Sequence, residues 1–501
     1  MGFINNHLTE RYKTIMAYTG LILIFCGFVM LTPLLSLIKY PQELPLSATF
    51  IEFAVLISSL GVALRFAFGS MKNRVLDFQE SSIVVFLSWV IFCIFSAFPL
   101  MKIIHLDFTQ AVFESVSAWT TTGLSVVDVD HCPYMVLLWR SIMQFCGGAG
   151  MAVIMMASIA GPSGAGLYSA EGKGSQMKPQ VKDSARIVVW IYVGYAIIGT
   201  VSFYLAGMNW FDAVNHCFAA ISTGGFSTHS TNIGFWDKTS IEVVAIILMI
   251  IGNVNFVTVY FFLKGKLKTV LKNGEIKVMM VLIPLSSYFV FLFTTRFLYD
   301  ALPKQIRVAV FEVVTALTTT GFSTVSYLNW SDPGIFILII LMLIGGGTCS
   351  TAGGIKQYRI YVLYKTVLWQ IKKSLLPRSA VKQNFVWEWE NKDYITDSKV
   401  KEIANYVVLY FFLFFLGSFI IMINHNPNGQ LYTMKEAFFE FSSALSTVGI
   451  SIGVTNPNAP KVVLWDLTLG MFLGRLEFFI IFTGIFKILL DSKKLFRFKK
   501  S

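Results

Sequence analysis

The chain has 501 residues, of which 55% are hydrophobic and 14% are charged, and its formal net charge is +12. Soluble domains carry roughly 25% charged residues, so this composition indicates a membrane protein and excludes an ordinary soluble enzyme. A basic chain can also bind nucleic acid, but the sequence has no soluble basic domain and no interleaved aromatic motif. We therefore expect no nucleic-acid partner.

Ten apolar segments are long enough to cross a bilayer as helices, which takes about 20 residues each. In chain order they lie near 17–38, 47–69, 81–101, 134–160, 186–207, 241–263, 277–299, 335–365, 403–423 and 462–490. The first two predict a transmembrane hairpin within residues 1–78.

One short phrase occurs four times between these segments. Its copies are A-W-T-T-T-G-L-S ending at Ser125, A-I-S-T-G-G-F-S ending at Ser227, A-L-T-T-T-G-F-S ending at Ser323, and A-L-S-T-V-G-I-S ending at Ser451. The copies are far enough apart to leave a whole structural unit between them, which is typical of repeat architecture.

Each copy follows a short apolar run, at 108–119, 211–221, 306–317 or 433–445. These runs are too short to cross a bilayer at the helical rise per residue, so we interpret them as re-entrant half-helices. Irregular backbone is tolerated at membrane depth only where protein or water satisfies its polar groups, so four such loops predict a central aqueous path.

The alternative is that these phrases are helix-terminating turns that recur by chance. A glutamate or histidine at a constant distance before each glycine argues against chance, and these residues are Glu114, His216, Glu312 and Glu440. Behind a filter they would hold the loop geometry through hydrogen bonds to backbone N–H groups, or they would set the local charge for an ion. We favour the scaffold role, because a carboxylate directly in the path would bind the ion too tightly.

The predicted fold is an all-α polytopic membrane protein. After the N-terminal hairpin come four units, each made of a span, a pore helix, a filter loop and a second span, around a central pore. The units are placed at 79–165, 184–270, 275–375 and 400–490, with a cytoplasmic linker at 376–400 and a basic tail at 491–501. We expect the linker to contain an amphipathic segment and no site.

The basic residues predict the orientation in the membrane. When alternate loops are assigned to one side, most of the 40 Lys and Arg residues gather on that side. Under the positive-inside rule it is the cytoplasm. We therefore expect a multi-pass protein of the plasma (inner) membrane, with both termini cytoplasmic and the four loops near the outer face.

The composition of the loops indicates a cation path. A cation that leaves water needs a cage of oxygens, and backbone carbonyls supply one where glycine lets the chain turn. Half-helices that enter from outside aim the partial negative charge of their C-terminal ends at the centre. The predicted ion-binding residues are Thr121, Thr122, Gly123, Leu124, Thr223, Gly224, Gly225, Phe226, Thr319, Thr320, Gly321, Phe322, Thr447, Val448, Gly449 and Ile450.

Three further phrases, with the four loops, carry a resemblance to a known family. They are W-R-S-I-M-Q-F-C-G-G-A-G at 139–150, G-G-G-T-C-S-T-A-G-G-I-K at 345–356 and M-F-L-G-R-L-E at 471–477. Over essentially its whole length the chain resembles the superfamily of potassium transporters that includes TrkH, KtrB, the plant HKT proteins and KdpA. The extra hairpin at 1–78 makes it similar to the TrkH-like members, because KtrB-like proteins have only the four core repeats.

The resemblance implies that the filter glycines are Gly123, Gly225, Gly321 and Gly449. In this superfamily a serine at the first of them is associated with sodium transport, so the glycine here implies K⁺ as the transported ion. Loop 4 departs from the other loops at Val448 and Ile450, which leaves the strictness of selectivity open. A sodium-selective or weakly selective channel is one alternative. A symporter of K⁺ with H⁺ or Na⁺ is another, although four units that run in the same direction favour a channel-like path.

The glycine cluster in the third unit is expected to be a gate. A continuous helix is poorly stabilised by so many glycines, and in relatives the segment is an intramembrane loop that blocks the pore until it moves. The alternative is close packing of helices through small residues. The gate residues are Gly345, Gly346, Gly347, Thr348, Cys349, Ser350, Thr351, Ala352, Gly353 and Gly354.

Arg475 lies near the middle of the last apolar segment, where an arginine costs on the order of 2.5–3.5 kcal/mol. The resemblance implies that it lies below the filter as an electrostatic obstacle to the permeating cation. The alternative is a structural ion pair with a pore-helix carboxylate.

The sequence has no nucleotide-hydrolysis, metalloprotease or Ser–His–Asp motif, so we expect no enzyme, no catalytic residue and no covalently bound cofactor. The resemblance implies a homodimer, with a pore in each protomer, that is gated by a cytoplasmic TrkA-like nucleotide-binding ring. The basic inner surface would dock either that ring or anionic lipid headgroups.

Overall fold

The computed structural model describes residues 2–69, 76–150, 181–377, 384–388 and 391–498. The end of the first unit beyond residue 150, part of the linker and the end of the tail lie outside these residues. Among them, six helices are long and apolar enough to cross a membrane, and one bent pair makes up to seven. The prediction of an all-α polytopic membrane protein is confirmed.

The N-terminal hairpin packs its two long helices closely. It consists of α1 (Gly2–Met30) and α2 (Leu44–Phe68), joined by the short 3₁₀ helices η1 (Thr32–Ile38) and η2 (Pro41–Glu43). A Cβ added to Gly27 would lie 2.8 Å from the carbonyl oxygen of Ala54, so only glycine allows this approach. Small residues of this kind typically bring membrane helices together.

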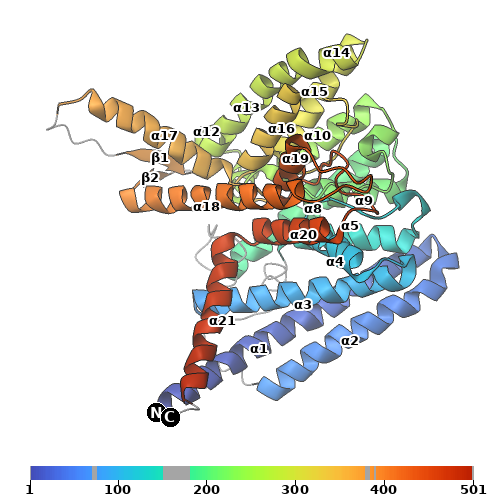
Figure 1. Ribbon diagram of the computed structural model, residues 1–501, viewed down its shortest axis with the longest axis vertical. Coiled ribbons are helices and arrows are strands. Elements are labelled where there is room, and N and C mark those ends of the chain that lie inside the picture. The colour runs from blue at the N-terminus through green and yellow to red at the C-terminus, as the bar shows by residue number, and fades with distance from the viewer. Residues whose placement is uncertain (1, 70–75, 151–180, 378–383, 389–390, 499–501) are drawn as a thin grey trace.

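The same order of elements then recurs four times (Figure 1). Each unit has a long first helix, a short pore helix, a loop and a second helix. The first helices are α3 (Phe78–Ile104), α8 (Val181–Ala206), α13 (Gly274–Val290) with its extensions η5 (Phe291–Thr295) and α14 (Arg296–Leu298), and α18 (Asp397–Met422). The pore helices are α4 (Phe108–Trp119), α9 (Trp210–Ile221), α15 (Leu302–Leu317) and α19 (Met434–Leu445). The second helices begin with α5 (Tyr134–Ala149), α10 (Thr239–Asn253), α16 (Asp332–Ile344) and α20 (Lys461–Arg475).

Side-chain caps fix where three of the pore helices begin. Asp107, Asn209 and Thr433 each accept a hydrogen bond from the backbone N–H three residues later, at 2.9, 2.9 and 3.3 Å. Such caps satisfy backbone donors that a helix leaves unpaired at its start. The remaining pore helix, α15 of unit three, has a proline in its first turn, and proline has no backbone N–H that needs such a partner. The short 3₁₀ helices η3 (Val129–His131) and η4 (Asn232–Phe235) lie in the loops that follow α4 and α9.

The second helices are broken in units two, three and four. Helix α10 meets α11 (Phe256–Leu263) at a bend of 109°. Helix α16 ends at the glycine loop and the chain resumes in α17 (Gln357–Ser374), and α20 ends at Arg475 before α21 (Phe478–Phe498). Only the break in unit three was expected, since the apolar runs at 241–263 and 462–490 appear continuous. Composition does not reveal a break whose freed backbone groups are satisfied by a neighbouring loop.

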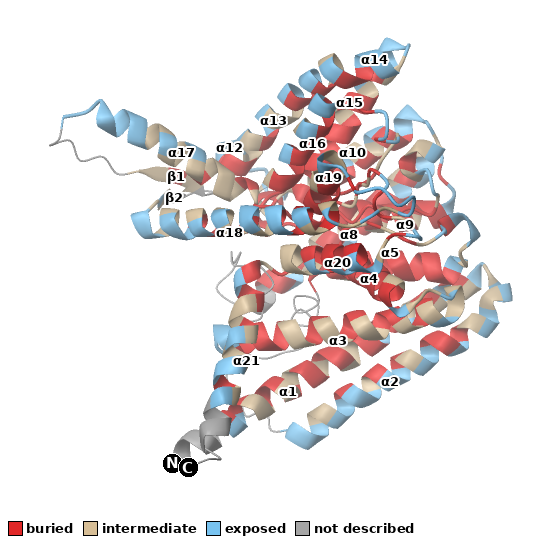
Figure 2. Ribbon diagram, viewed as in Figure 1, coloured by how far each residue is buried: buried red, intermediate tan, exposed pale blue. Residues whose placement is uncertain are grey.

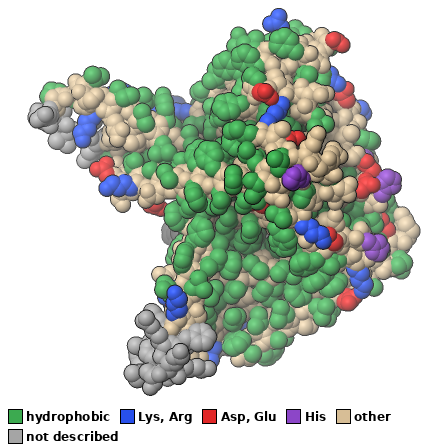
Figure 3. All heavy atoms as spheres, in the orientation of Figure 1, with side chains coloured by type: hydrophobic (Ala, Val, Ile, Leu, Met, Phe, Trp, Pro, Cys, Tyr) green, Lys and Arg blue, Asp and Glu red, His purple; other side chains and the backbone are tan. Residues whose placement is uncertain are grey.

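The pore helices are more deeply buried than the outer helices (Figure 2). The inner residues of α4, α5, α9, α15 and α19 are buried, whereas α2, α13 and α18 keep apolar faces exposed. Hydrophobic side chains cover much of the surface over these outer helices, and charged ones lie mainly toward the edges (Figure 3). A bilayer is the solvent that such an apolar surface fits.

Both termini lie at one end of the molecule (Figure 1). Here Tyr12 of α1 donates a hydrogen bond of 3.2 Å to Asp491 of α21. The linker contains strands β1 (Phe385–Glu388) and β2 (Asn391–Tyr394), which pair antiparallel beside α17, and the amphipathic segment stays a prediction. The short helix α12 (Leu267–Lys272) joins units two and three.

Candidate functional site: a ring of four loops

The four loops interlock around one axis. A Cβ added to Gly123 would collide with the carbonyl oxygen of Gly224 in the next loop, and the same holds around the ring. The other three glycines meet carbonyl oxygens in the same way: Gly225 meets Thr320, Gly321 meets Val448, and Gly449 meets Thr122. The four segments, far apart in the sequence, therefore form a closed ring in which each glycine leaves room for its neighbour's backbone.

The loops also share one backbone conformation. The threonines two residues before the glycines, Thr121, Thr223, Thr319 and Thr447, have φ values of 54°, 52°, 54° and 51°, and the four glycines have φ values from 72° to 102°. A β-branched residue rarely takes a positive φ, and such strain persists where the surrounding structure demands it. The fourfold repetition of this conformation marks the ring as a built feature.

Hydroxyl groups gather at the ends of the pore helices that lead into the ring. Thr120 and Thr122 share a hydrogen bond of 2.8 Å, and Thr318 and Thr320 do the same in loop 3. In the part of the chain that the structure describes, the buried hydroxyls of Thr121 and Thr447 have no hydrogen-bond partner. The ring therefore presents oxygen atoms whose lone pairs are not taken by the protein.

Three pore-helix glutamates hold the chain just after each glycine. Glu440 accepts hydrogen bonds from Ser451 Oγ at 2.8 Å and from the backbone N–H of Ile452 at 3.2 Å. Glu114 binds Ser125 Oγ and the N–H of Val126 in the same way, at 3.0 and 3.1 Å. Glu312 binds the N–H and hydroxyl of Thr324, at 2.9 and 2.7 Å, and also accepts from Tyr327. All three carboxyl groups are fully buried behind the loops.

His216 stands at the corresponding position of unit two. Its Nε2 lies 2.9 Å from Ser227 Oγ and its Nδ1 lies 2.8 Å from the carbonyl oxygen of Asp212. It therefore contacts the same loop serine as the glutamates do in units one and four. These hydrogen bonds agree with the scaffold role, and the ion-binding role of the loops stays a prediction.

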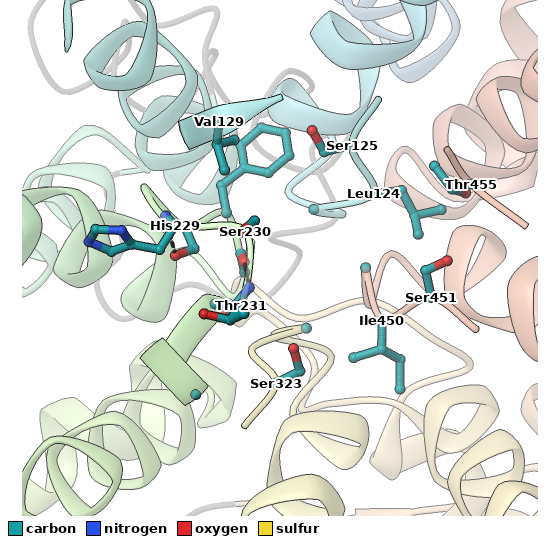
Figure 4. Close-up of a pocket in the computed structure, with 18 of the residues that line it drawn as sticks. Leu124, Ser125, Val129, His229, Ser230, Thr231, Ser323, Ile450, Ser451 and Thr455 are labelled. Carbon is teal, nitrogen blue, oxygen red and sulfur yellow. Dashed lines mark hydrogen bonds between the residues drawn. The ribbon is translucent and has the colours of Figure 1, made fainter. Parts of the chain in front are cut away.

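A cavity of about 600 Å³ opens above the ring, and all four loops line it. Figure 4 shows Leu124 and Ser125 of loop 1, Ser323 of loop 3 and Ile450 and Ser451 of loop 4 around it, with residues 229–231 of loop 2. Polar and apolar groups contribute about equally to this mouth, and a serine of every loop lines it: Ser125, Ser227, Ser323 and Ser451.

The glycine loop of unit three covers the other end of the ring. The N–H of Gly353 donates to Thr319 Oγ1 at 2.8 Å, and Thr351 Oγ1 lies 3.2 Å from Thr223 Oγ1. A Cβ on Gly353 would collide with the carbonyl oxygen of Ser446. The loop thus contacts threonines of loops 2 and 3 and the end of the pore helix of unit four.

The same loop docks on the break between α10 and α11. The N–H of Gly347 donates to the backbone and side-chain oxygens of Asn253, both at 3.2 Å, and Thr351 Oγ1 donates to Gly252 O at 2.9 Å. In return, the N–H of Phe256 donates to Cys349 O at 3.3 Å. The two irregular segments therefore satisfy one another's backbone groups.

Glu275, near the start of α13, was missed by the sequence reasoning and binds this loop. Its Oε1 accepts hydrogen bonds of 2.7 Å from both the N–H and the hydroxyl of Thr348. Asn255, which the sequence indicated only as a general interhelical contact, donates to the same hydroxyl at 3.3 Å. In the sequence Glu275 lies in a polar stretch between Lys272 and Lys277, so no local signal identified it as a site residue.

Arg475 is the last residue of α20 and lies at the break before α21, not within a continuous span. Its guanidinium donates to the carbonyl oxygens of Thr351 in the glycine loop and of Gly147 and Gly148 at the end of α5. The arginine that pairs with a pore-helix glutamate is Arg140, whose Nε lies 2.7 Å from Glu114. Arg475 therefore bridges units one, three and four.

Two buried side chains of α5 reach the ring, and the sequence reasoning assigned neither. Arg140 donates to Ser125 Oγ at 2.9 Å, and its guanidinium carbon lies 3.9 Å from the centre of the aromatic ring of Phe226. One turn later, Gln144 contacts the backbone of loop 2. Both belong to the phrase at 139–150, so the signal was present, but a motif does not say what its polar residues touch.

This fold and this ring define a class: polytopic membrane proteins in which four pore-loop units of one chain surround an axis. A family model described as TrkH, a cation transport protein, matches residues 46–498, and the chain belongs to this family. The predicted relationship is confirmed. Membership places the chain among transporters and not among enzymes.

Named relatives and a solved structure extend over nearly the whole chain. The chain is 30% identical over 479 residues to an uncharacterized cation transporter of Methanocaldococcus jannaschii, covering 94% of each chain. It is 30% identical over 492 residues to the Trk system potassium uptake protein TrkG of Escherichia coli, covering 92% of this chain and 97% of that one. The crystal structure of the potassium transporter TrkH from Vibrio parahaemolyticus is similar with a TM-score of 0.81 and 26% identity, covering 95% and 98% of the two chains.

Proposed function

We propose that this protein takes up K⁺ through the ring of four loops, which acts as its selectivity filter. The observation that carries the proposal is the interlocked ring, in which each filter glycine lies against a backbone carbonyl of the next loop. Within the described residues, the buried hydroxyls of Thr121 and Thr447 also have no hydrogen-bond partner. Rings of carbonyl oxygens replace the hydration shell of a cation in selective channels. Relatives whose names specify potassium uptake support K⁺ as the ion.

The glycine loop at 345–354 is proposed as the gate of this path. It lies against the inner threonines of the ring and is held there by Arg475 and Glu275. Because these restraints are hydrogen bonds to loop backbone, a modest rearrangement of the surrounding helices can release it. Arg475 adds a positive charge beside the path, which raises the energy of a passing cation.

We infer that the left-hand end of the helices in Figure 1, which carries both termini, α17 and the two strands, faces the cytoplasm of a cell whose plasma membrane holds the protein. This end is rich in Lys and Arg, as the positive-inside rule requires. A homodimer and a TrkA-like nucleotide-binding ring that docks at this end complete the proposal. The basis for the partner is the Trk system named for the relatives. Anionic lipid is the competing occupant of the basic surface.

Cation flux tests the function directly. Purified protein in liposomes would be given imposed K⁺ and Na⁺ gradients, and the wild type would be compared with Gly123→Ser. We expect a strong preference for K⁺ in the wild type and its loss in the variant, because a Cβ at this position collides with the carbonyl of Gly224. Equal passage of both ions would replace the proposal with a weakly selective channel, and K⁺ movement only with a proton or sodium gradient would replace it with a symporter.

A further inference from the structure

Loop 2 lacks two side chains that other loops use to stabilise themselves. In loops 1 and 4, the N–H of the filter glycine donates to a serine six residues earlier, Ser117 at 3.1 Å and Ser443 at 3.0 Å. Loop 2 has Ala219 there. Loops 1 and 3 also have a threonine just before the filter glycine, whereas loop 2 has Gly224.

The backbone conformation does not explain this extra glycine. Gly224 has no positive φ, so any residue could adopt its conformation. A steric constraint explains why this position is glycine. A Cβ on Gly224 would lie 2.6 Å from Oε1 and 2.8 Å from Nε2 of Gln144, closer than packed atoms come.

Gln144 occupies that space and makes hydrogen bonds to the loop. It is fully buried in α5, its Nε2 donates to Gly224 O at 2.5 Å, and its Oε1 accepts from the N–H of Phe226 at 3.2 Å. Gly224 O is the oxygen that Gly123 approaches in the ring. The carboxamide therefore fixes a carbonyl at the junction of loops 1 and 2.

We propose that Gln144 is a positioning residue that determines ion selectivity: from a helix of unit one it supplies the side chain that loop 2 of unit two lacks. The proposal rests on the proposed filter function. A carbonyl held by a buried amide keeps its direction when an ion arrives, so the cage keeps its size and favours one ion. Without the amide, loop 2 has neither the serine nor the threonine that other loops have at the positions equivalent to 219 and 224, nor a substitute for them.

The first test separates hydrogen bonding from volume. Gln144→Met keeps the length and approximate volume of the side chain but has no N–H to donate to Gly224 O at any pH. We expect the ratio of K⁺ to Na⁺ flux to fall about fivefold, the effect of one lost hydrogen bond. The matched control is Gln305→Met, since Gln305 Nε2 also donates to a carbonyl oxygen, that of Tyr299, at a site away from the ring. Its flux ratio should not change. An unchanged ratio in Gln144→Met overturns the proposal.

The second test uses the shared space. Gly224→Thr alone should lose most K⁺ flux, because the new side chain must displace the buried carboxamide of Gln144 from its hydrogen bonds to Gly224 O and Phe226 N–H. Adding Gln144→Ala removes the collision and gives loop 2 the threonine of loops 1 and 3, so the double variant should regain K⁺ flux relative to Gly224→Thr. A double variant no better than Gly224→Thr overturns the proposal.

The two tests keep failure of this inference distinct from failure of the proposed function. If the wild type itself does not discriminate K⁺ from Na⁺, both the proposed filter function and the role of Gln144 in selectivity are wrong. The rescue in total flux, and in the melting temperature of the purified protein, still reports whether Gln144 and Gly224 share one space. A selective wild type with no rescue would leave the filter intact and exclude Gln144 from it.

Discussion

At the scale of single residues, Arg475 combines two effects. The sequence predicts either an electrostatic obstacle in the path or a structural ion pair with a pore-helix carboxylate. The structure adds its hydrogen bonds to carbonyl oxygens of Thr351, Gly147 and Gly148, which attach the glycine loop to the end of α5. Cations bind favourably at the C-terminal end of a helix, where carbonyl groups are unpaired. The same side chain thus holds the loop, and its proposed second role is to repel a passing ion.

Replacing Arg475 separates these two effects. We expect Arg475→Ala to raise K⁺ flux roughly tenfold or more, since hydrogen bonds to charged groups contribute about 1.5–3 kcal/mol each. Arg475→Lys keeps the charge but cannot reach several carbonyls with one planar group, so its flux should be intermediate. Liposome flux measures both. Unchanged flux in correctly folded Arg475→Ala would refute both roles.

At the scale of elements, the glycine loop and the α10–α11 break are joined by hydrogen bonds and depend on each other. Each satisfies backbone groups that the other leaves open, at Gly347, Thr351 and Phe256. Unpaired polar groups are costly in the membrane interior, so neither segment can leave without a new partner for both. Movement of the proposed gate should therefore involve the broken helix of unit two.

Glu275 restrains the glycine loop through hydrogen bonds, and the effect of removing it on K⁺ flux can be measured. We expect Glu275→Ala to increase K⁺ flux severalfold in protein without any partner, because the loop loses two hydrogen bonds at Thr348. Combining it with Thr348→Val should add less than the sum of the single effects, since both remove the same interaction. Glu402→Ala, at an exposed position of α18, is the control. Fully additive effects would show that the two residues act independently.

At the scale of the whole molecule, the ring must close between the first and last units. Lys461 of α20 lies 2.9 Å from Asp107, which also caps α4. Gln110 of α4 donates to Pro457 O at 2.9 Å. These contacts connect residues that are more than 300 positions apart and keep α4 and α20 together.

Asp107 should make the stability of this closure depend on pH. Hydrogen bonds from the N–H of Gln110 and from Lys461 lower the pKa of Asp107 below its ordinary value. A lowered pKa in the folded state stabilises the protein above the unfolded value of about 4, and this contribution is lost as the pH falls through the folded pKa. Asp107→Ala should cost about 1 kcal/mol at neutral pH, the usual cost of losing a cap.

The matched variant is Asp107→Asn, which can still cap the helix, as Asn209 does in unit two. It should lose little stability at neutral pH and should no longer contribute to acid sensitivity. Melting temperatures at pH 7 and below pH 4, measured in detergent, check both variants. Equal losses for Ala and Asn would show that the ion pair, not the cap, carries the effect.

Much of this protein follows from its sequence alone. Composition determines a membrane protein, because only a bilayer accommodates so much apolar surface. The repeated phrase determines four similar loops, since the same local sequence gives the same threonine and glycine conformations in each. The sequence also predicts that the upstream Glu and His residues contact the loops, because each lies on a short helix at a constant distance before the filter glycine.

Only the tertiary structure decided which segments meet. The order of the loops around the axis, the breaks after Asn253 and Arg475, and the contacts of Gln144 and Glu275 all depend on neighbours distant in the chain. An apolar run has the same composition whether its helix is straight or broken. Whether a break is stable depends on the loop that satisfies its backbone groups, and a local sequence pattern carries no information about that partner.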